Sequence, residues 1–293
     1  MTAAPNASTT ATVFHNAVLT GACGGLGQAL AKDLIAQGAK VALLGMQRPA
    51  LEALAALAPA HTRIYTFDVT DSAAMQAAAQ DWMAFAGMPD LVIANAGVAS
   101  GFDTAQSHDL AVLRRMLEIN VLGPATTFQP FVHALQTQGI QTPQRCALVG
   151  IASIAGWRGM PGNGAYCASK GALIRYLESL RAEWRGTPVT VHTVCPGYLR
   201  TTLTANNQFA MPGLMEPQAA AQTMLARIAK GHAHIVIPRR TGWLSRLLGC
   251  LPDAWADHLL RGQPRKARWG EPGGNPIPGM RAAGDSPPHS HPQ

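Results

Sequence analysis

The chain alternates short apolar runs with longer amphipathic stretches over most of its length. A short continuous apolar run is typical of a strand buried on both faces, and apolar positions three and four apart are typical of a helix. The predicted strands span residues 16–20, 41–44, 63–67, 91–94, 146–151, 189–194 and 234–237. Predicted helices fill the gaps, for example at residues 28–37, 72–86, 108–122 and 173–184.

This alternation predicts right-handed parallel βαβ units in a single α/β domain, residues 13–238, with a doubly wound parallel sheet and helices on both faces. Ligands of such sheets bind beyond the carboxyl ends of the strands, where the strand order reverses. Gly21, Asn95, Ser153 and Pro196 each follow a predicted strand, so we expect them to gather at that edge.

The segments outside this domain differ from it in composition. Residues 1–12 lack the basic region and apolar core of a secretory signal, and residues 270–293 are rich in glycine and proline, so we expect both to be disordered. No apolar run approaches the roughly 20 residues that span a bilayer. Five cysteines without metal-ligand spacing predict reduced thiols, no metal site and a cytoplasmic location.

Residues 239–269 form a basic, amphipathic extension with seven basic and two acidic residues, which is +5 of the formal net charge of +7. The charges are interleaved with Trp243, Leu244, Leu247, Leu248, Leu251, Trp255, Leu259, Leu260 and Trp269. Two interpretations are open: the apolar face covers the substrate pocket or a subunit interface, or the segment lies on an anionic membrane surface. Nucleic-acid binding is not expected, because nothing pairs the charge with a recognition fold.

Two motifs carry candidate chemistry. The predicted strand at 16–20 runs into Gly21-Ala22-Cys23-Gly24-Gly25-Leu26-Gly27 and then into a helix, an arrangement that places a pyrophosphate at a helix N-terminus. Tyr166 and Lys170 lie four residues apart and therefore on one helix face. Ser153, at the end of a predicted strand, adds a hydroxyl, and the three groups together outline a proton-transfer site. Taken singly, each has an ordinary packing or capping interpretation.

Six motifs in register resemble the short-chain dehydrogenase/reductase family: Thr20-Gly21-x-x-x-Gly25-x-Gly27, Ala94-Asn95-Ala96-Gly97, Asn120, Ser153, Tyr166-x-x-x-Lys170 and Pro196-Gly197. The resemblance covers roughly residues 13–238. It implies a Rossmann-like single domain, a nicotinamide cofactor, and interconversion of an alcohol with a ketone or aldehyde. It also implies a homodimer or homotetramer.

The same resemblance implies a catalytic set of Asn120, Ser153, Tyr166 and Lys170. Tyr166 would donate the proton in reduction and accept it in oxidation. Lys170 would lower the phenol pKa from about 10 and bond the nicotinamide ribose. Ser153 would hold the substrate oxygen, and Asn120 would support a water-mediated proton relay.

The resemblance further implies cofactor contacts from Gly21, Gly25, Leu26, Gly27, Asp68, Val69, Asn95, Gly97, Tyr166, Lys170, Pro196, Gly197 and Thr201. The glycines would line the pyrophosphate, and Thr201 would lie at the nicotinamide carboxamide. Asp68 would contact the adenine edge, although it is also a candidate helix N-cap for residue 72 onward. Asn95 would hold the central strands together more than it touches the ligand.

The residues after the predicted strand at 41–44 favour NADP(H) over NAD(H). Gly45 stands where an NAD enzyme usually carries an acid for the ribose 2′-hydroxyl, and Arg48 could pair with a 2′-phosphate. The arginines that NADP-dependent members of the family usually carry are missing, since Gly24 and Met46 occupy those positions.

Residues 203–215 correspond to the mobile lid of the family, and Phe209, Met211, Leu214 and Met215 favour a mainly apolar alcohol or carbonyl substrate. Packing of a surface helix explains the same residues. Two alternatives to a soluble enzyme follow: a peripheral membrane-associated reductase of a lipophilic substrate, and a regulatory protein that binds nucleotide without turnover. The complete catalytic set favours an enzyme.

Overall fold

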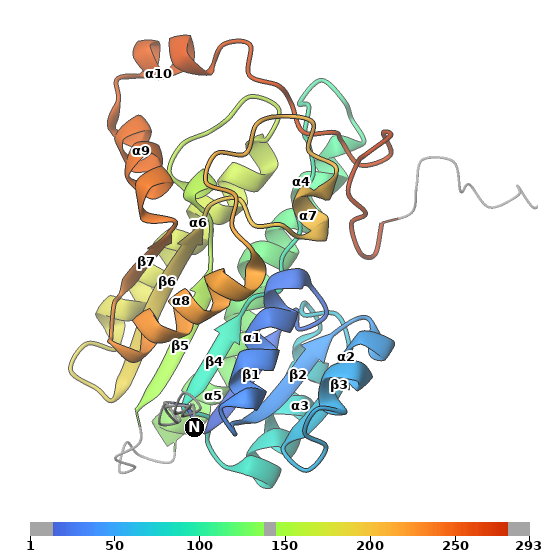
Figure 1. Cartoon of the computed structure of the whole chain (residues 1–293), viewed down its shortest axis with the longest axis vertical. Helices are drawn as coiled ribbons and strands as arrows, with labels where there is room; N and C mark the ends of the chain where they lie inside the picture. The colour runs from blue at the N-terminus through green and yellow to red at the C-terminus, as the bar shows by residue number, and fades with distance from the viewer. Residues whose placement is uncertain (1–13, 138–144, 281–293) are drawn as a thin grey trace, which may run out of the picture.

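The computed structural model describes residues 14–137 and 145–280 of the 293-residue chain. Within these ranges seven parallel strands form one sheet in the order β3-β2-β1-β4-β5-β6-β7 (Figure 1). They are β1 Asn16–Thr20, β2 Lys40–Gly45, β3 Thr62–Thr66, β4 Leu91–Ala94, β5 Cys146–Ile151, β6 Val189–Pro196 and β7 His234–Ile237. The strand order reverses between β1 and β4, which confirms the predicted doubly wound sheet.

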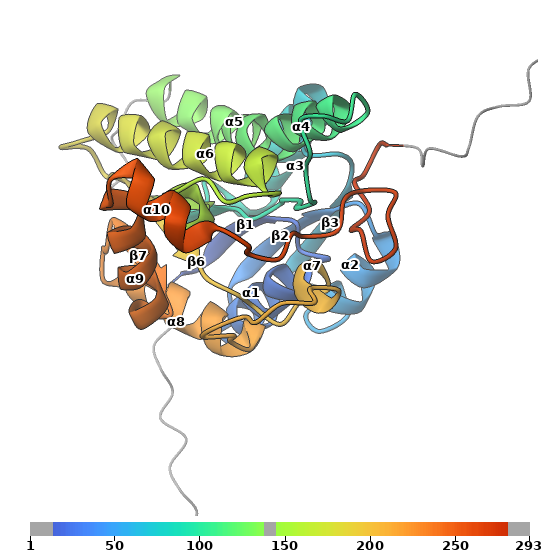
Figure 2. The same ribbon diagram turned by 90° about the horizontal axis from the view of Figure 1, so that it is seen from above.

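Helices cover both faces of the sheet, as predicted (Figure 2). The α-helices are α1 Gly25–Ala36, α2 Arg48–Ala55, α3 Ser72–Ala86, α4 Asp109–Leu117, α5 Gly123–Thr137, α6 Gly164–Glu183, α7 Thr202–Ala205, α8 Pro217–Ala229, α9 Arg239–Cys250 and α10 Asp253–Leu260. A π-helical turn, η1 Glu118–Leu122, joins α4 to α5, and a 3₁₀ turn, η2 Ile154–Gly156, follows β5.

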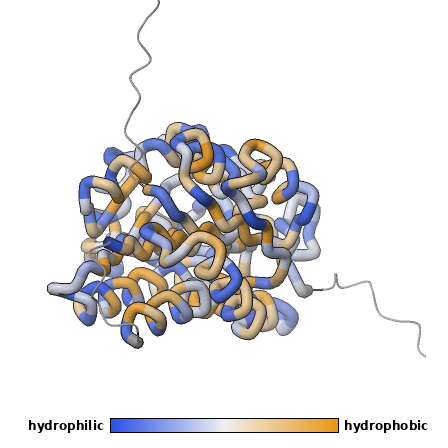
Figure 3. Tube along the Cα trace, turned by 90° about the horizontal axis from the view of Figure 1, so that it is seen from below, coloured by the Kyte–Doolittle hydropathy of each residue, from blue (hydrophilic) through white to orange (hydrophobic). Residues whose placement is uncertain are grey.

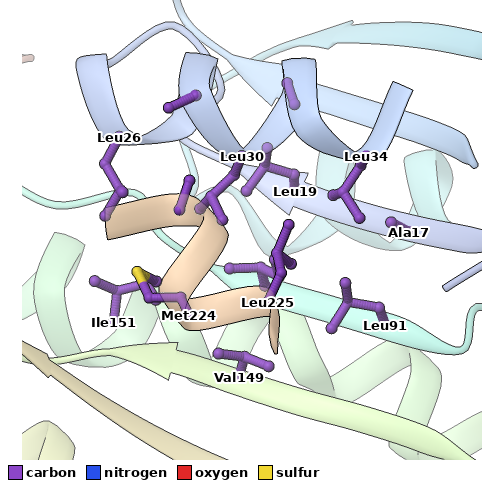
Figure 4. Packing of buried hydrophobic residues seen from close by; sticks show 14 of the residues in the cluster. Ala17, Leu19, Leu26, Leu30, Leu34, Leu91, Val149, Ile151, Met224 and Leu225 are labelled. Atoms are coloured by element: carbon purple, nitrogen blue, oxygen red, sulfur yellow. The ribbon is translucent and has the colours of Figure 1, made fainter. Parts of the chain in front are cut away.

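The core consists of two apolar layers, one on each face of the sheet. Leu30 and Leu34 of α1 meet Met224 and Leu225 of α8 over the strands (Figure 4). On the other face, side chains of α3, α5 and α6 pack together, including the fully buried Trp82. The strands are hydrophobic through the centre of the molecule, whereas the helices alternate hydrophobic and hydrophilic positions (Figure 3). This pattern is expected for strands buried on both faces.

Helix boundaries differ from the prediction where the chemistry lies. The first helix begins at Gly25 rather than residue 28, so the glycine-rich loop is itself the helix N-terminus. A continuous helix over 108–122 was expected, but α4 ends at Leu117 and the π-helical turn follows. Such turns are rare and often mark functional positions. Here the turn contains Asn120, whose side chain bonds to groups outside its own helix.

The end of the described chain is ordered, contrary to expectation. Residues 261–280, called the C-terminal strap below, run back from α10 to the part of the sheet near α4 and α7 (Figure 1). Ile277 is 3% exposed and packs with Val98, Val112 and Met116. The prediction of disorder is therefore wrong for residues 270–280, because a few long-range contacts hold a segment whose glycine and proline content is typical of disorder. Residues 1–12 and 281–293 lie outside the described residues.

No helix within the described ranges combines the length and the apolar character that crossing a bilayer requires.

Candidate active site

A cavity of about 720 Å³ opens at the carboxyl edge of the sheet. The segments that follow β1, β2, β4, β5 and β6 line it, as the topology predicts. Of the residues predicted to form the site, fourteen positions line this cavity: Gly21, Gly25, Leu26, Gly27, Asp68, Val69, Asn95, Gly97, Ser153, Tyr166, Lys170, Pro196, Gly197 and Thr201. Asn120 and Arg48 are the two predicted residues that do not.

The glycine-rich loop has no room for side chains at its key positions. Gly21 has φ +65°, and a Cβ there would lie 2.7 Å from the Cα of Ala96. A Cβ on Gly27 would lie 2.1 Å from the carbonyl oxygen of Gly21, which is closer than atoms pack. No side chain caps the N-terminus of α1. Its first N–H groups therefore remain available to an anion, and the helix dipole favours negative charge at this end.

Ser153, Tyr166 and Lys170 converge on one wall of the cavity. Ser153 is 7% exposed at the end of β5, and its Oγ accepts from Ala155 N at 3.2 Å. Tyr166 and Lys170 lie one turn apart on α6, with the Lys170 Nζ 5.9 Å from the centroid of the Tyr166 ring. The Lys170 Nζ donates to the carbonyl oxygen of Ile151 at 2.8 Å, which anchors this side chain to β5.

Burial dominates the acid–base properties of this pair. Burial raises the pKa of Tyr166 to about 12, although a hydrogen bond with Ser153 lowers it. Burial also lowers the pKa of Lys170 to about 8. In the chain alone, desolvation of the phenolate outweighs the other influences on the tyrosine pKa. That Lys170 lowers this pKa together with a bound, positively charged nicotinamide stays a prediction.

Asn120 is fully buried behind the cavity wall. Its Nδ2 donates to the carbonyl oxygen of Val98 at 3.0 Å and to Ser169 Oγ at 2.9 Å, and its Oδ1 accepts from Val98 N at 2.9 Å. Ser169 Oγ in turn donates to the carbonyl oxygen of Tyr166 at 2.9 Å. Asn120 therefore ties the loop after β4 to α6, and Ser169 is a partner that the sequence did not single out.

Asp68 and Asn95 hold loops at the cavity edge. Asp68 accepts from Thr70 N at 3.0 Å and forms a salt bridge with Arg115. Burial raises the pKa of Asp68, but the Thr70 hydrogen bonds and the Arg115 charge more than offset this and hold it below its usual value. The N-cap of α3 is Asp71 rather than Asp68. Asn95 Nδ2 donates to the carbonyl oxygens of residues 20 and 21, each at 3.1 Å, which joins β1 to β4 as expected.

The end of β2 carries no acid beside the cavity. Gly45 faces the Cys23 Sγ, which a Cβ at Gly45 would approach to 2.5 Å. Met46 is half exposed and lines the cavity. Arg48 is well exposed and forms a salt bridge with Glu52 at 2.8 Å. No disulfide joins the five cysteines, all of which the structure describes.

The C-terminal segments supply a wall that the motifs do not reveal. Leu244 and Leu248 of α9 and Leu260 of α10 line the cavity. The strap adds Lys266, Asn275, Pro276 and Pro278. The Lys266 Nζ donates to the carbonyl oxygen of Leu203 at 2.7 Å and to Asn207 Oδ1 at 2.8 Å. The strap therefore holds the segment after β6 at Leu203 and Asn207. The apolar residues Trp269, Ile277 and Met280 of the strap, which pack on one cluster, are the sequence signal for this packing.

Residues 14–137 and 145–280 contain no group of three or more histidine, cysteine, aspartate or glutamate side chains able to hold a metal ion.

Three comparisons identify the relatives of this arrangement. The family model for short chain dehydrogenases matches residues 15–211. A protein from Myxococcus xanthus described as an uncharacterized oxidoreductase is 37% identical over 251 residues, which is 85% of this chain and 97% of that protein. A Burkholderia cenocepacia short chain dehydrogenase, solved in complex with NADP, is 25% identical with a TM-score of 0.71, covering 87% of this chain and all of that one.

A Burkholderia phymatum short chain dehydrogenase/reductase, solved in complex with NAD, has a TM-score of 0.70 at 24% identity and shares the fold over 86% of this chain and 96% of that one. The matched residues include the glycine-rich loop, Ser153, Tyr166 and Lys170. The family model spans more than half of the chain. This protein is therefore an NAD(P)-dependent oxidoreductase that belongs to the short-chain dehydrogenase/reductase family.

Proposed function

We propose that this enzyme interconverts a mainly apolar alcohol with its ketone or aldehyde, with a preference for NADP(H). The convergence of Ser153, Tyr166 and Lys170 on the same cavity as the glycine-rich loop carries this proposal. The nicotinamide supplies or accepts the hydride, and the protein orients the reactants and moves the proton.

Tyr166 acts as the proton donor in the reduction direction. Its pKa of about 12 keeps the phenol protonated at neutral pH, as a donor must be. Ser153 donates a hydrogen bond to the substrate oxygen as negative charge develops on it. Lys170 presents its ammonium one turn from the phenol. Asn120 holds the loop after β4 against α6.

The cofactor residues fit an extended dinucleotide. The uncapped start of α1 suits the pyrophosphate. Gly25 lies so close to Thr201 that a Cβ would stand 2.9 Å from Thr201 Cγ2, and both residues line the cavity. Asp68 and Val69 border the same cavity farther along the sheet edge and suit the adenine.

The preference for NADP(H) rests on the missing acid at the end of β2. Without a carboxylate at Gly45 there is no repulsion against a 2′-phosphate. Arg48 does not line the cavity, but its exposed salt bridge with Glu52 is of a kind that contributes little stability. Replacing the Glu52 carboxylate by a 2′-phosphate as the partner of Arg48 would therefore cost little free energy.

The cavity wall next to Tyr166 supports an apolar substrate. Met160, Phe209, Leu244, Leu248 and Leu260 line it. Because apolar walls bind by excluding water from apolar surface, a hydrocarbon group next to the carbonyl is the best match. We further propose a cytoplasmic location, which the five free cysteines support.

Fluorescence titration with NADPH and NADH, followed by a carbonyl-reduction assay with the nucleotide that binds more tightly, tests the proposal. We expect tighter binding of NADPH and turnover of apolar ketones. Tyr166→Phe should retain nucleotide binding and lose turnover by about 10²–10⁴-fold, because it removes the proton but little volume. Retained turnover in this variant would refute the role of Tyr166. Failure of both nucleotides to bind would refute the proposed function.

A further inference from the structure

Five large apolar side chains lie exposed on the two helices beside the cavity. Trp243, Leu244 and Leu247 of α9 are 70%, 67% and 62% exposed, and Trp255 and Leu259 of α10 are 69% and 57% exposed. We call these five residues the apolar rim. Elsewhere in the described chain, the exposed large hydrophobic residues include no aromatic side chain. Large exposed apolar groups gathered in one place usually mark an interaction surface.

The apolar residues share one face on each helix. Trp243 and Leu247 are four residues apart on α9, as are Trp255 and Leu259 on α10, and residues at this spacing lie side by side on a helix. The acids of α10, Asp253 and Asp257, are offset by two residues from Trp255 and Leu259 and so lie on the opposite side.

Positively charged residues flank the rim along the chain. Arg239, Arg240, Arg246, Arg261 and Arg265 belong to this part of the chain. None of the five forms a salt bridge with a described residue. The Asp253 carboxylate is already bonded to Arg158 at 2.8 Å. The surface therefore combines exposed tryptophans and leucines with cations that lack protein counter-charges.

This combination makes a symmetric contact with a second copy of the chain unfavourable. In a two-fold dimer the same surface is used twice, so ten arginines without counter-charges would be brought together. An anionic phospholipid surface matches both properties at once. Tryptophans and leucines enter the boundary between headgroups and acyl chains, while arginines bind the phosphates.

The apolar rim is continuous with the cavity. Leu244 belongs to both, because it is 67% exposed and also lines the cavity. Leu260 lines the cavity next to the exposed Leu259. The two helices follow one another at the same end of the molecule, with α10 above α9 in Figure 1. A molecule leaving a bilayer at this end would reach the cavity along apolar side chains.

We propose that α9 and α10 dock the enzyme on an anionic phospholipid surface, with the cavity opening toward the lipid. The docking itself is independent of the reaction. The further consequence, that the substrate is a membrane-dissolved alcohol or ketone, rests on the proposed function.

Sedimentation of the full-length protein with phosphatidylcholine vesicles, with and without phosphatidylserine, tests the docking. We expect binding only when phosphatidylserine is present, with a blue shift of tryptophan fluorescence. Raising the salt from about 0.1 M to about 1 M should weaken binding, because it shortens the Debye length from about 10 Å to about 3 Å. Point substitutions are preferable to deletion of the helices, whose other faces form the cavity wall.

Two pairs of variants separate the apolar and charged contributions. Trp243→Ser with Leu247→Ser should weaken vesicle binding at least tenfold, whereas Leu57→Ser, at a position 57% exposed on a distant surface, should leave it unchanged. Each arginine near an anionic surface contributes about fivefold, so Arg240→Glu should lower affinity more than fivefold. Arg185→Glu, the same charge change beyond the end of α6, is its control.

Three results would overturn the docking: no binding to phosphatidylserine vesicles, equal loss in the control variants, or a concentration-dependent dimer that Trp243→Ser with Leu247→Ser dissociates in light scattering. Because vesicle binding requires no turnover, these results leave the proposed reaction untouched. Conversely, vesicle binding by an enzyme that reduces no carbonyl would refute the reaction alone.

Discussion

The glycine-rich loop and the C-terminal segments line the same cavity but are built in different ways. The loop depends on backbone: Gly21 and Gly27 pack so closely that no side chain fits, and the helix N-terminus supplies the binding groups. The wall formed by α9, α10 and the strap depends on side chains, one of which, Leu244, is 67% exposed. A backbone site constrains residue type tightly, whereas an apolar wall accepts many residues of similar size.

Gly27→Ala should have the largest effect of the four substitutions, a loss of nucleotide affinity. The added Cβ would lie 2.1 Å from the Gly21 carbonyl oxygen, so the loop must move. We expect nucleotide affinity to fall at least about 100-fold in fluorescence titration, because a displaced loop loses several phosphate contacts. Gly159→Ala, which meets no atom within 4 Å, is the control and should bind normally. Normal binding by Gly27→Ala would show that the loop tolerates side chains.

Ile277→Ala tests whether the strap is part of the folded domain. The side chain is 3% exposed among Val98, Val112 and Met116, so its truncation should lower the free energy of unfolding by about 2–5 kcal/mol in urea denaturation. Pro272→Ala, at an exposed position of the same strap, is the control. If Ile277→Ala lowers the free energy of unfolding by less than about 0.5 kcal/mol, the packing of this side chain is contradicted. That result would agree with the disorder expected from the composition of the strap.

Lys170→Met tests the free-energy cost of burying the Lys170 ammonium. The pKa of Lys170 is about 8 in the folded protein against 10.5 for the free group, so between these values the unfolded chain binds the proton and the folded chain does not. Stability from this group therefore rises with pH, by about 2 kcal/mol from pH 8 to pH 10. Burial also lowers the pKa of Lys266 to about 8, so Lys266 contributes a rise of its own in both proteins. In urea titrations the variant should therefore show a smaller rise than the wild type, reduced by the Lys170 contribution. Identical pH dependence in the two proteins would contradict the burial effect.

Met46→Asp should have the smallest effect of the four substitutions, a change in cofactor preference. It places a carboxylate at the half-exposed position after Gly45 without disturbing Cys23. We expect NADPH affinity to fall roughly tenfold and NADH affinity to be retained or improved, because the acid repels a 2′-phosphate and can accept from a 2′-hydroxyl. Glu52→Gln, which releases Arg48 without adding a charge, is the comparison and should not weaken NADPH binding.

The cofactor side was largely predictable from the sequence because its signals are local. Apolar runs gave all seven strands within two residues of their observed ends. Positive φ and close backbone approach leave glycines at fixed positions, which a sequence shows directly. The π-helical turn around Asn120 was not predicted. The Asn120 side chain bonds to Ser169, a residue distant in the chain, and such a contact leaves no local signal in the sequence.

The C-terminal side was harder to predict because its structure depends on distant contacts. The amphipathic pattern of residues 239–269 indicated helices, and α9 and α10 are present, but the pattern does not say which apolar side chains face the cavity. For the strap, composition indicated disorder. Asn275, whose Nδ2 bonds to the carbonyl oxygens of Ala99 and Leu203, shows how one side chain outweighs that tendency.

The strap also determines when during synthesis the site is complete. Its residues leave the ribosome after every strand of the sheet, yet Asn275 and Ile277 attach to segments made much earlier. The glycine-rich loop leaves the ribosome long before the strap does. The cavity wall of a nascent chain is therefore unfinished until residues 261–280 have been made.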